Sequence, residues 1–210
     1  MNQIMQENNG DPGQPPSLNE AYWDARYREG QTGWDLREVS PPIKAYIDQL
    51  INKDLRILIP GCGSGHEAAY LLDMGFSNIT VIDIAPTIVK ALQKRFSDNP
   101  QVKIVLGDFF EHNGTYDLIL EQTFFCALPP SRRKEYVTKM KALLRPGGKL
   151  TGLLFNRNFE QEGPPFGGEK QAYEKLFSQE FNIRNLDSCY NSFEKRAGSE
   201  LFFLMEQKAS

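Results

Sequence analysis

Short apolar runs alternate with longer amphipathic runs through the middle of the chain. The short runs predict buried strands, and the longer runs, whose apolar residues recur at helical spacing, predict helices. The predicted strands cover residues 56–59, 79–82, 102–106, 116–120 and 150–155, and the helices between them cover residues 66–74, 86–96 and 131–144. This alternation predicts an α/β fold, with a Rossmann-like, mostly parallel sheet and crossover helices on both faces. In such a sheet the ligand lies beyond the carboxyl ends of the strands, where the strand order reverses.

Further elements flank this alternating region. Before it, two helices are predicted, one at residues 18–29 and one from Ser40 onward, where a serine N-cap precedes two prolines. After it, a helix and two strands are predicted near residues 171–177, 181–186 and 201–206. A polar loop joins these last two strands, which we expect to form an antiparallel hairpin at one edge of a seven-stranded sheet.

Size and charge limit the possible classes of protein. The 210 residues fit one domain, which we place at residues 18–210. Residues 1–17 are rich in Asn, Gln, Gly and Pro, and we expect them to be a disordered tail. A net charge of −3 without a long basic run argues against nucleic-acid binding. We interpret the basic cluster at residues 132–134 as the solvated face of a helix.

The chain has neither an apolar run of membrane-spanning length nor a signal pattern, so we expect a cytoplasmic protein. Its three cysteines lie far apart and it has only two histidines, which predicts neither a disulfide framework nor a metal site. Nothing in the sequence requires more than a monomer.

A glycine-rich turn follows the first predicted strand directly. It reads Pro60-Gly61-Cys62-Gly63-Ser64-Gly65 and leads into a predicted helix. A strand, a glycine turn and a helix in this order bring the backbone close to a ligand. Asp83 ends the next strand, 22 positions after Gly61, where a carboxylate accepts hydrogen bonds from both ribose hydroxyls of an adenosine. The two features together predict a nucleotide-type ligand rather than a turn that is only tight.

The glycine spacing distinguishes between such ligands. A dinucleotide site has G-x-G-x-x-G, whereas here the third glycine comes one place early and His66 takes its position. The Gly-Lys-Ser/Thr of a Walker loop is absent. The G-x-G-x-G form after an apolar strand resembles the first motif of class I methyltransferases that use S-adenosylmethionine (SAM). This resemblance implies SAM as the cofactor and S-adenosylhomocysteine as the product.

Two more segments resemble the same class of enzymes. Gly107-Asp108-Phe109 after the third strand is similar to the adenine-binding segment, with Asp108 toward the adenine amine and Phe109 against its face. Residues 144–150 are similar to the usual turn into the fifth strand. An aspartate that caps a turn and a phenylalanine that packs in the core fit the same residues equally well, so both interpretations stay open.

Three motifs indicate a narrower family. They are Trp23-Asp24-Ala25-Arg26-Tyr27 followed by Gly30-Gln31-Thr32-Gly33-Trp34-Asp35, then Glu121-Gln122-Thr123-Phe124-Phe125-Cys126-Ala127-Leu128, and finally Gly163-Pro164-Pro165-Phe166. In this order they resemble the thiopurine S-methyltransferase superfamily, and within it the branch of halide and thiol methyltransferases. The resemblance runs from about Leu18 to the C-terminus.

This resemblance implies a cofactor site beneath a lid at about residues 18–40. The cofactor-binding residues that it implies are Trp23, Tyr27, Trp34, Gly61, Gly63, Asp83, Asp108, Phe109 and Gln122, and the substrate-binding residues are Trp34, Phe124, Phe125 and Phe166. Plant halide and thiol enzymes usually have Trp where Tyr27 stands and Tyr where Gln122 stands. The mammalian thiopurine enzyme has Arg at the Gln122 position, and the missing Arg argues against a thiopurine as the natural substrate.

The expected activity is methyl transfer from SAM to a small soft nucleophile, which is a thiol, hydrosulfide, thiocyanate or halide. An anion and a cationic sulfur lose charge as they react, so a dry, apolar pocket favours in-line displacement. A soft anion needs no general base, so no catalytic side chain is assigned, although Glu121 and His66 stay open as candidates for proton removal. The alternatives are a thiopurine or amine acceptor and a SAM-binding regulator without catalysis.

Overall fold

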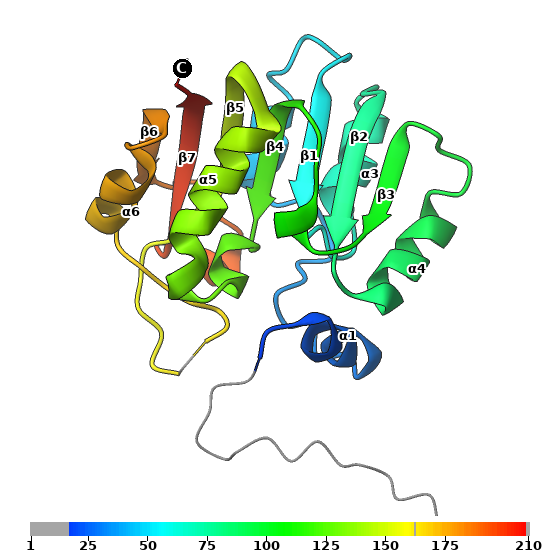
Figure 1. Ribbon diagram of the computed structural model, residues 1–210, viewed down its shortest axis with the longest axis horizontal. Coiled ribbons are helices and arrows are strands. Elements are labelled where there is room, and N and C mark those ends of the chain that lie inside the picture. Colours follow the sequence, from blue (N-terminus) through cyan, green and yellow to red (C-terminus); the bar gives the residue numbers. More distant parts are fainter. Residues whose placement is uncertain (1–16, 162, 209–210) are drawn as a thin grey trace, which may run out of the picture.

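The structure is a computed structural model that describes residues 17–161 and 163–208. It contains a seven-stranded sheet in the order β3-β2-β1-β4-β5-β7-β6 (Figure 1). The strands are β1 (Arg56–Pro60), β2 (Asn78–Asp83), β3 (Val102–Leu106), β4 (Tyr116–Gln122), β5 (Leu144–Phe155), β6 (Phe181–Ser188) and β7 (Glu200–Gln207). Strands β1 to β5 pair in parallel, and β7 runs antiparallel to β5 and β6. The predicted mostly parallel sheet with an edge hairpin is confirmed, whereas the predicted tail lies outside the described residues except for Ser17.

Helices cover both faces of this sheet. They are α1 (Glu20–Arg28), α2 (Pro41–Ile47), α3 (His66–Asp73), α4 (Pro86–Arg95), α5 (Arg133–Leu143) and α6 (Lys170–Phe177). Successive side chains of a strand point to opposite faces, and β1 shows the result. Leu58 packs in a core with residues of α5 and α6, while Ile57 and Ile59 pack in a second core with residues of α2, α3 and α4. Burial on both faces explains why the central strands read as continuous apolar runs.

The helix starts follow their sequence signals, with one difference. Asn19 caps α1 by accepting a hydrogen bond from the Tyr22 backbone N–H over 3.1 Å, and α4 begins at a proline. Ser40 stands at the predicted N-cap of α2, but its hydroxyl makes no capping bond. It donates instead to Oε1 of Gln122 over 2.8 Å, which links α2 to the end of β4.

Strand β5 begins earlier than the sequence pattern predicts, at Leu144 rather than at residue 150. Leu144 pairs with Tyr116 and Lys149 pairs with Leu118, and the register shifts between these two pairs. The strand therefore continues on both sides of an irregular segment. Pro146 and the two glycines after it lead us to predict that the strand starts only after them. Such residues also occur where a strand bulges, which explains the difference.

The strand order reverses between β1 and β4, which are neighbours in the sheet. The loops that leave the carboxyl ends of these two strands therefore meet at one place. In Figure 1 the arrowheads of β2, β3 and β4 point toward α1, which lies across this edge of the sheet. No helix in the described ranges combines the length and apolar character that a membrane span requires.

Candidate active site

A pocket of about 780 Å³ opens at the carboxyl ends of the central strands, and we call it the main pocket. Its walls come from α1 and the following loop, the glycine turn, the segments after β2, β3 and β4, and a residue close to β7. The predicted site residues that line it are Trp23, Tyr27, Trp34, Gly61, Asp83, Asp108, Phe109 and Phe124. The predicted residues that lie elsewhere are Gly63, Gln122, Phe125 and Phe166. A pocket of this volume is in the usual range for a small-molecule site, about 300–1,000 Å³.

The glycine turn connects β1 to α3 through left-handed backbone. The φ angle is +56° at Gly61 and +49° at Gly63, a region that favours glycine. A Cβ atom at Gly61 would collide with the ring of Phe124, so the turn and Phe124 form one continuous wall. The backbone N–H of Gly63 donates to Oδ2 of Asp83 over 3.1 Å, which ties the turn to the end of β2.

Asp83 presents a buried carboxylate to the main pocket, with 6% of the residue exposed. Besides the Gly63 bond, its Oδ1 accepts a hydrogen bond from the Ala85 N–H over 3.0 Å. Burial raises the pKa of the Asp83 carboxyl, because the charged form loses solvation there. A carboxylate has about four acceptor positions, so two backbone donors leave Asp83 able to accept from a ligand.

The sequence left open whether Asp108 and Phe109 only cap a turn and pack in the core or also border the ligand. Asp108 accepts a hydrogen bond from the Phe110 N–H over 2.9 Å and so caps the short helix η1 (Phe109–Glu111). Phe109 is buried, and its ring lies 5.1 Å from that of Phe124, centroid to centroid. Both residues also line the main pocket. The cap and the core contact therefore hold them in the pocket wall.

The predicted lid corresponds to α1 and the loop that leads to Trp34, and both line the main pocket. The Trp34 ring meets Trp23 at 5.6 Å and Tyr27 at 5.7 Å, both in edge-to-face geometry. Asp24 accepts a hydrogen bond from the Thr87 N–H over 2.7 Å, which attaches α1 to the start of α4. No residue of α1 is fully buried, so the segment is attached to the rest of the fold by polar contacts such as this one.

The turn after β4 separates two adjacent phenylalanines. Thr123 has a φ of +61°, which is uncommon for a residue with a Cβ atom. Phe124 lines the main pocket, whereas Phe125 is 1% exposed and packs in the core against Tyr136 and Tyr173. The predicted substrate contact of Phe125 is therefore wrong, because this ring belongs to the α5–α6 side of the sheet.

The Pro-Pro-Phe motif after β5 also needs a correction. Pro164 and Pro165 line the main pocket, but Phe166 does not. The Phe166 N–H donates to the carbonyl of Cys126 over 2.7 Å, and its ring covers Gly163. Phe166 thus anchors the loop that brings the prolines to the pocket. The motif identified the right loop and the wrong residue.

A second cavity of about 50 Å³ lies beside the glycine turn and shares Trp34, Gly61 and Thr123 with the main pocket. Gly63, Gln122 and His66 also line it. The amide nitrogen of Gln122 is buried there, with no hydrogen-bond partner in the described part of the chain. Nε2 of His66 lies 2.8 Å from Oδ1 of Asp35. Any cofactor contact of Gly63 or Gln122 would be where the two cavities adjoin, and His66 does not line the main pocket.

Glu121 is fully buried behind the pocket wall. Its Oε1 accepts hydrogen bonds from the backbone N–H groups of Phe124 and Phe125 over 2.9 and 3.0 Å, and its Oε2 accepts one from the Tyr136 hydroxyl over 2.8 Å. Burial raises the pKa of Glu121 to about 7, although these donors favour the charged form. Glu121 does not line the main pocket, so it too is not placed to take a proton from an acceptor there.

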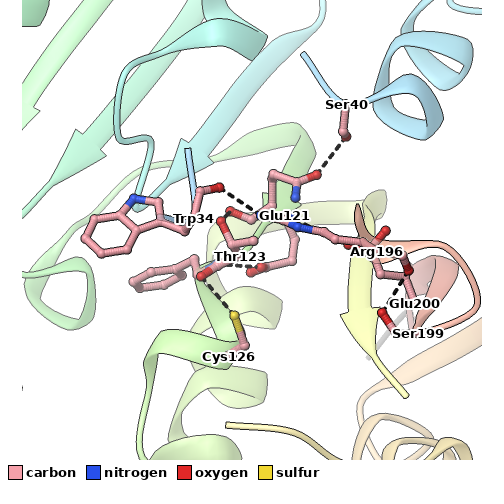
Figure 2. Close-up of polar contacts among 10 residues, drawn as sticks. Trp34, Ser40, Glu121, Thr123, Cys126, Arg196, Ser199 and Glu200 are labelled. Carbon is pink, nitrogen blue, oxygen red and sulfur yellow. Dashed lines mark hydrogen bonds and ion pairs between the residues drawn. The ribbon is translucent and has the colours of Figure 1, made fainter. Parts of the chain in front are cut away.

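The sequence did not indicate Arg196, which also lines the main pocket. This arginine is 8% exposed and precedes β7. Its guanidinium donates to the carbonyl oxygen of Trp34 over 2.8 Å and lies 3.5 Å from the buried carboxylate of Glu200. Figure 2 shows Arg196 reaching across to the backbone of Trp34. The two residues are 162 positions apart, so no local pattern could have joined them.

The basic cluster at residues 132–134 is not simply a solvated face. Arg132 lines the main pocket and lies 3.5 Å above the centre of the Phe110 ring. Arg133 packs over Phe125 at 4.9 Å and donates to the carbonyl of Gly167 over 2.7 Å. The position of this cluster, soon after the loop that leaves β4, was the available signal that it lies near the pocket.

Known proteins resemble this chain in sequence and in fold. The sequence profile of the family described as Thiopurine S-methyltransferase matches residues 18–208. A protein named probable thiol methyltransferase 2 from Arabidopsis thaliana is 33% identical over 159 residues, which cover 73% of this chain and 70% of that protein. Thiocyanate methyltransferase 1 from Brassica oleracea is 27% identical over 192 residues, covering 89% and 84%. The structure of 1,6-didemethyltoxoflavin-N1-methyltransferase from Burkholderia thailandensis superposes with a TM-score of 0.72 at 20% identity, covering 90% and 87%.

Proposed function

Because the chain belongs to the thiopurine S-methyltransferase family and is a SAM-dependent methyltransferase, we propose that its methyl acceptor is a small soft nucleophile, which is a thiol, hydrosulfide, thiocyanate or halide. One observation carries this proposal, namely that the main pocket combines the aromatic rings of Trp34 and Phe124 with the buried cation of Arg196. An apolar wall beside a buried cation suits an anion that has left water. The names of the thiol and thiocyanate relatives support the same class of acceptor.

We place SAM between the glycine turn and the lid. In this proposal Asp83 accepts hydrogen bonds from the ribose hydroxyls, Asp108 and Phe109 border the adenine, and Trp23 and Trp34 face the sulfonium. The residues fit this cofactor, because the turn has no side chains at its glycines, Asp83 keeps free acceptor positions, and aromatic faces attract cations. Gly61, Gly63, Tyr27 and Gln122 complete the proposed cofactor site.

SAM, when bound, supplies a methyl group on a positively charged sulfur. The protein then has to hold the acceptor in line and to keep water out. Trp34 and Phe124 exclude water from two sides, and Arg196 attracts the anion to the same space. A desolvated soft anion is a stronger nucleophile, so these contacts favour direct displacement.

Such an anion needs no general base, and the described lining of the main pocket supplies no obvious one. This lining includes no His, Lys or Glu side chain. Burial raises the pKa of the Cys126 thiol to about 12 and also raises the pKa of the Tyr27 phenol, so both groups stay protonated at neutral pH. We therefore assign no catalytic base.

A thiopurine is the second candidate acceptor. The family description and the pocket volume of about 780 Å³ favour it, because a bulky aromatic thiol could extend toward Leu128 and Pro164. An amine acceptor, or SAM binding without catalysis, would be revealed by the same experiment.

The test is to incubate the purified protein with SAM and one acceptor at a time. The acceptors are thiocyanate, iodide, hydrosulfide, a small aliphatic thiol, a thiopurine and an amine, and the readout is the rate of S-adenosylhomocysteine formation by liquid chromatography. We expect kcat/KM to be highest for the soft anions. A higher value for the thiopurine or the amine would contradict the proposal. SAM binding by calorimetry without turnover of any acceptor would indicate a regulator.

Arg196→Lys provides the matching variant, because it keeps the charge and loses the planar guanidinium that contacts Trp34 and Glu200. We expect the KM for thiocyanate to rise by about tenfold, the order of one lost charged hydrogen bond. Arg184→Lys is the control, because Arg184 forms an exposed ion pair with Glu206 on the edge hairpin. Equal KM values for the two variants would remove Arg196 from the acceptor site.

A further inference from the structure

We propose that Glu121 is a positioning residue for methyl transfer, and that its ionised carboxylate holds the turn after β4 in the shape that puts Phe124 into the pocket wall. We call residues 121–125 the β4 turn. The inference rests on the proposed function, because Phe124 is placed there beside the acceptor. Glu121 acts through Phe124 and touches neither the cofactor nor the acceptor itself.

The hydrogen bonds of Glu121 span this turn. Its Oε1 accepts from the N–H groups of Phe124 and Phe125, and its Oε2 lies 3.2 Å from the Phe125 nitrogen as well. Charged acceptors make shorter and stronger hydrogen bonds than neutral ones. A single carboxylate therefore fixes two successive peptide groups at the start of η2 (Phe125–Ala127), next to the pocket.

The backbone of the turn needs such an anchor. Thr123 lies in the left-handed region, where a residue with a branched Cβ is strained, and strained backbone persists only where its surroundings hold it. Phe124, the next residue, fills the space over Gly61 that any Cβ there would require. A relaxed Thr123 would therefore move the ring that completes both the glycine-turn wall and the acceptor wall.

Tyr136 on α5 supports the turn in two ways. Its hydroxyl donates to Oε2 of Glu121, and its ring packs against Phe109, Phe124 and Phe125 at centroid distances of 6.1, 6.1 and 5.0 Å. The same residue thus orients the carboxylate and the rings around it. The Glu121–Tyr136 pair connects α5 to the pocket wall through a hydrogen bond between two fully buried side chains.

Burial raises the pKa of Glu121 to about 7, so this carboxyl changes charge near neutral pH, and burial also raises the pKa of Glu200. The titratable and charged groups around Glu121 are Tyr136 and Arg133 on α5, Cys126 on η2, Tyr173 on α6, Arg196 on the short helix η4 (Glu194–Arg196), and Glu200 at the start of β7. Burial raises the pKa values of the Cys126 thiol and the Tyr173 phenol to about 12 and also raises the pKa of the Tyr136 phenol, so these three stay neutral.

The first test measures kcat/KM for thiocyanate from about pH 6 to about pH 9, where thiocyanate stays an anion and the acceptor adds no titration of its own. We expect the wild-type value to rise with pH through about 7, following the ionisation of Glu121. Glu121→Gln should be about tenfold slower at high pH and should lack this rise, because an amide makes weaker hydrogen bonds to the turn and does not ionise. SAM affinity by calorimetry should change less than the thiocyanate KM.

Two further variants sharpen this test. Tyr136→Phe keeps the ring and removes one donor to the carboxylate, so the rise in kcat/KM should move to higher pH. Glu180→Gln is the matched control, because Glu180 forms an ion pair with Lys141 at the other end of α5. It should keep the wild-type pH profile. A flat wild-type profile, or a Glu121→Gln variant with wild-type rates and pH dependence, would overturn the proposal.

Hydrogen exchange supplies a readout that does not depend on turnover. At one pH, the amides of residues 122–128 should exchange about tenfold faster in Glu121→Gln than in the wild type, the order expected from one weakened charged hydrogen bond, while the amides of β5 should not change. Equal exchange in both proteins would overturn the positioning role. Altered exchange together with no turnover of any soft anion would retain this role and contradict the proposed function instead.

Discussion

At the scale of single residues, three buried carboxylates lie near the pocket and each has a different kind of partner. Asp83 accepts from backbone amides, Glu121 accepts from amides and a phenol, and Glu200 lies beside the guanidinium of Arg196. Burial of a carboxylate costs free energy unless donors compensate for the lost water. In Asp83 the compensation is incomplete, because it keeps acceptor positions free at the pocket. A ligand with paired hydroxyls would complete it.

The free acceptor positions of Asp83 lead to a prediction about cofactor binding. Asp83→Asn should weaken SAM binding by roughly 1–3 kcal/mol, the cost of leaving buried hydroxyls without a good acceptor. Isothermal titration calorimetry measures the difference. Asp117→Asn is the control, because Asp117 pairs with Arg145 and bonds the Arg56 N–H at the opposite end of the sheet. Equal SAM affinity in Asp83→Asn and wild type would remove Asp83 from the ribose site.

At the scale of elements, the lid and the sheet are held together very differently. The sheet has two buried cores, whereas α1 has no fully buried residue, and the lid is joined to the rest of the fold by hydrogen bonds such as Asp24–Thr87 and Arg196–Trp34. Elements with few buried contacts open at low free-energy cost. We therefore expect the predicted lid, rather than the sheet, to open for ligand exchange.

This difference predicts how Trp34→Ala behaves. The variant should lower kcat/KM for the best acceptor by more than about tenfold, the order of effect expected when substrate positioning is lost. Its free energy of unfolding should fall by less than the roughly 3–5 kcal/mol typical of a buried aromatic ring. Phe177→Ala, in the α6 core, is the contrasting variant and should lose stability on that larger scale. Denaturant titration and steady-state kinetics measure both effects, and a Trp34→Ala variant as unstable as Phe177→Ala would make Trp34 a core residue.

The helices, the strands and the part of the pocket formed by the glycine turn and the end of β2 could be predicted from the sequence, because their signals are local. Strand and helix periods lie within a few residues, and Gly61 and Asp83 are placed by the ends of their own strands. Phe125 was misplaced because the left-handed Thr123 decides which of two adjacent rings faces the pocket, and the sequence does not show that backbone angle. Arg196 was missed because only the pairing of β7 with β5 brings it to Trp34.

At the scale of the whole molecule, the pocket wall and the α5–α6 core share the Glu121–Tyr136 pair, so function and stability are linked there. The pKa of Glu121 is raised from 4.5 to about 7 in the folded protein. The folded state therefore binds a proton more tightly than the unfolded chain. The stabilisation from this proton is fully present below about pH 4.5 and is lost as the pH rises through about 7.

This linkage predicts a pH-dependent difference between two proteins. The free energy of unfolding of Glu121→Gln, relative to wild type, should increase by roughly 3 kcal/mol between the acidic and the alkaline side of this range. Urea titrations at several pH values measure it, and Glu180→Gln corrects for the loss of a partly exposed carboxylate. A constant difference across the range would mean that Glu121 titrates normally in the folded protein.

The position of β7 has a consequence for how the protein is made. β7 is the last of the seven strands along the chain, yet it lies between β5 and β6, and the arginine just before it meets the lid 162 positions upstream. During synthesis Trp34 and β5 therefore leave the ribosome before their partners Arg196 and β7. Contacts between such distant segments slow folding. A nascent chain that carries the whole cofactor motif still lacks a closed acceptor site, so it should acquire the ability to bind SAM before it acquires the ability to use it.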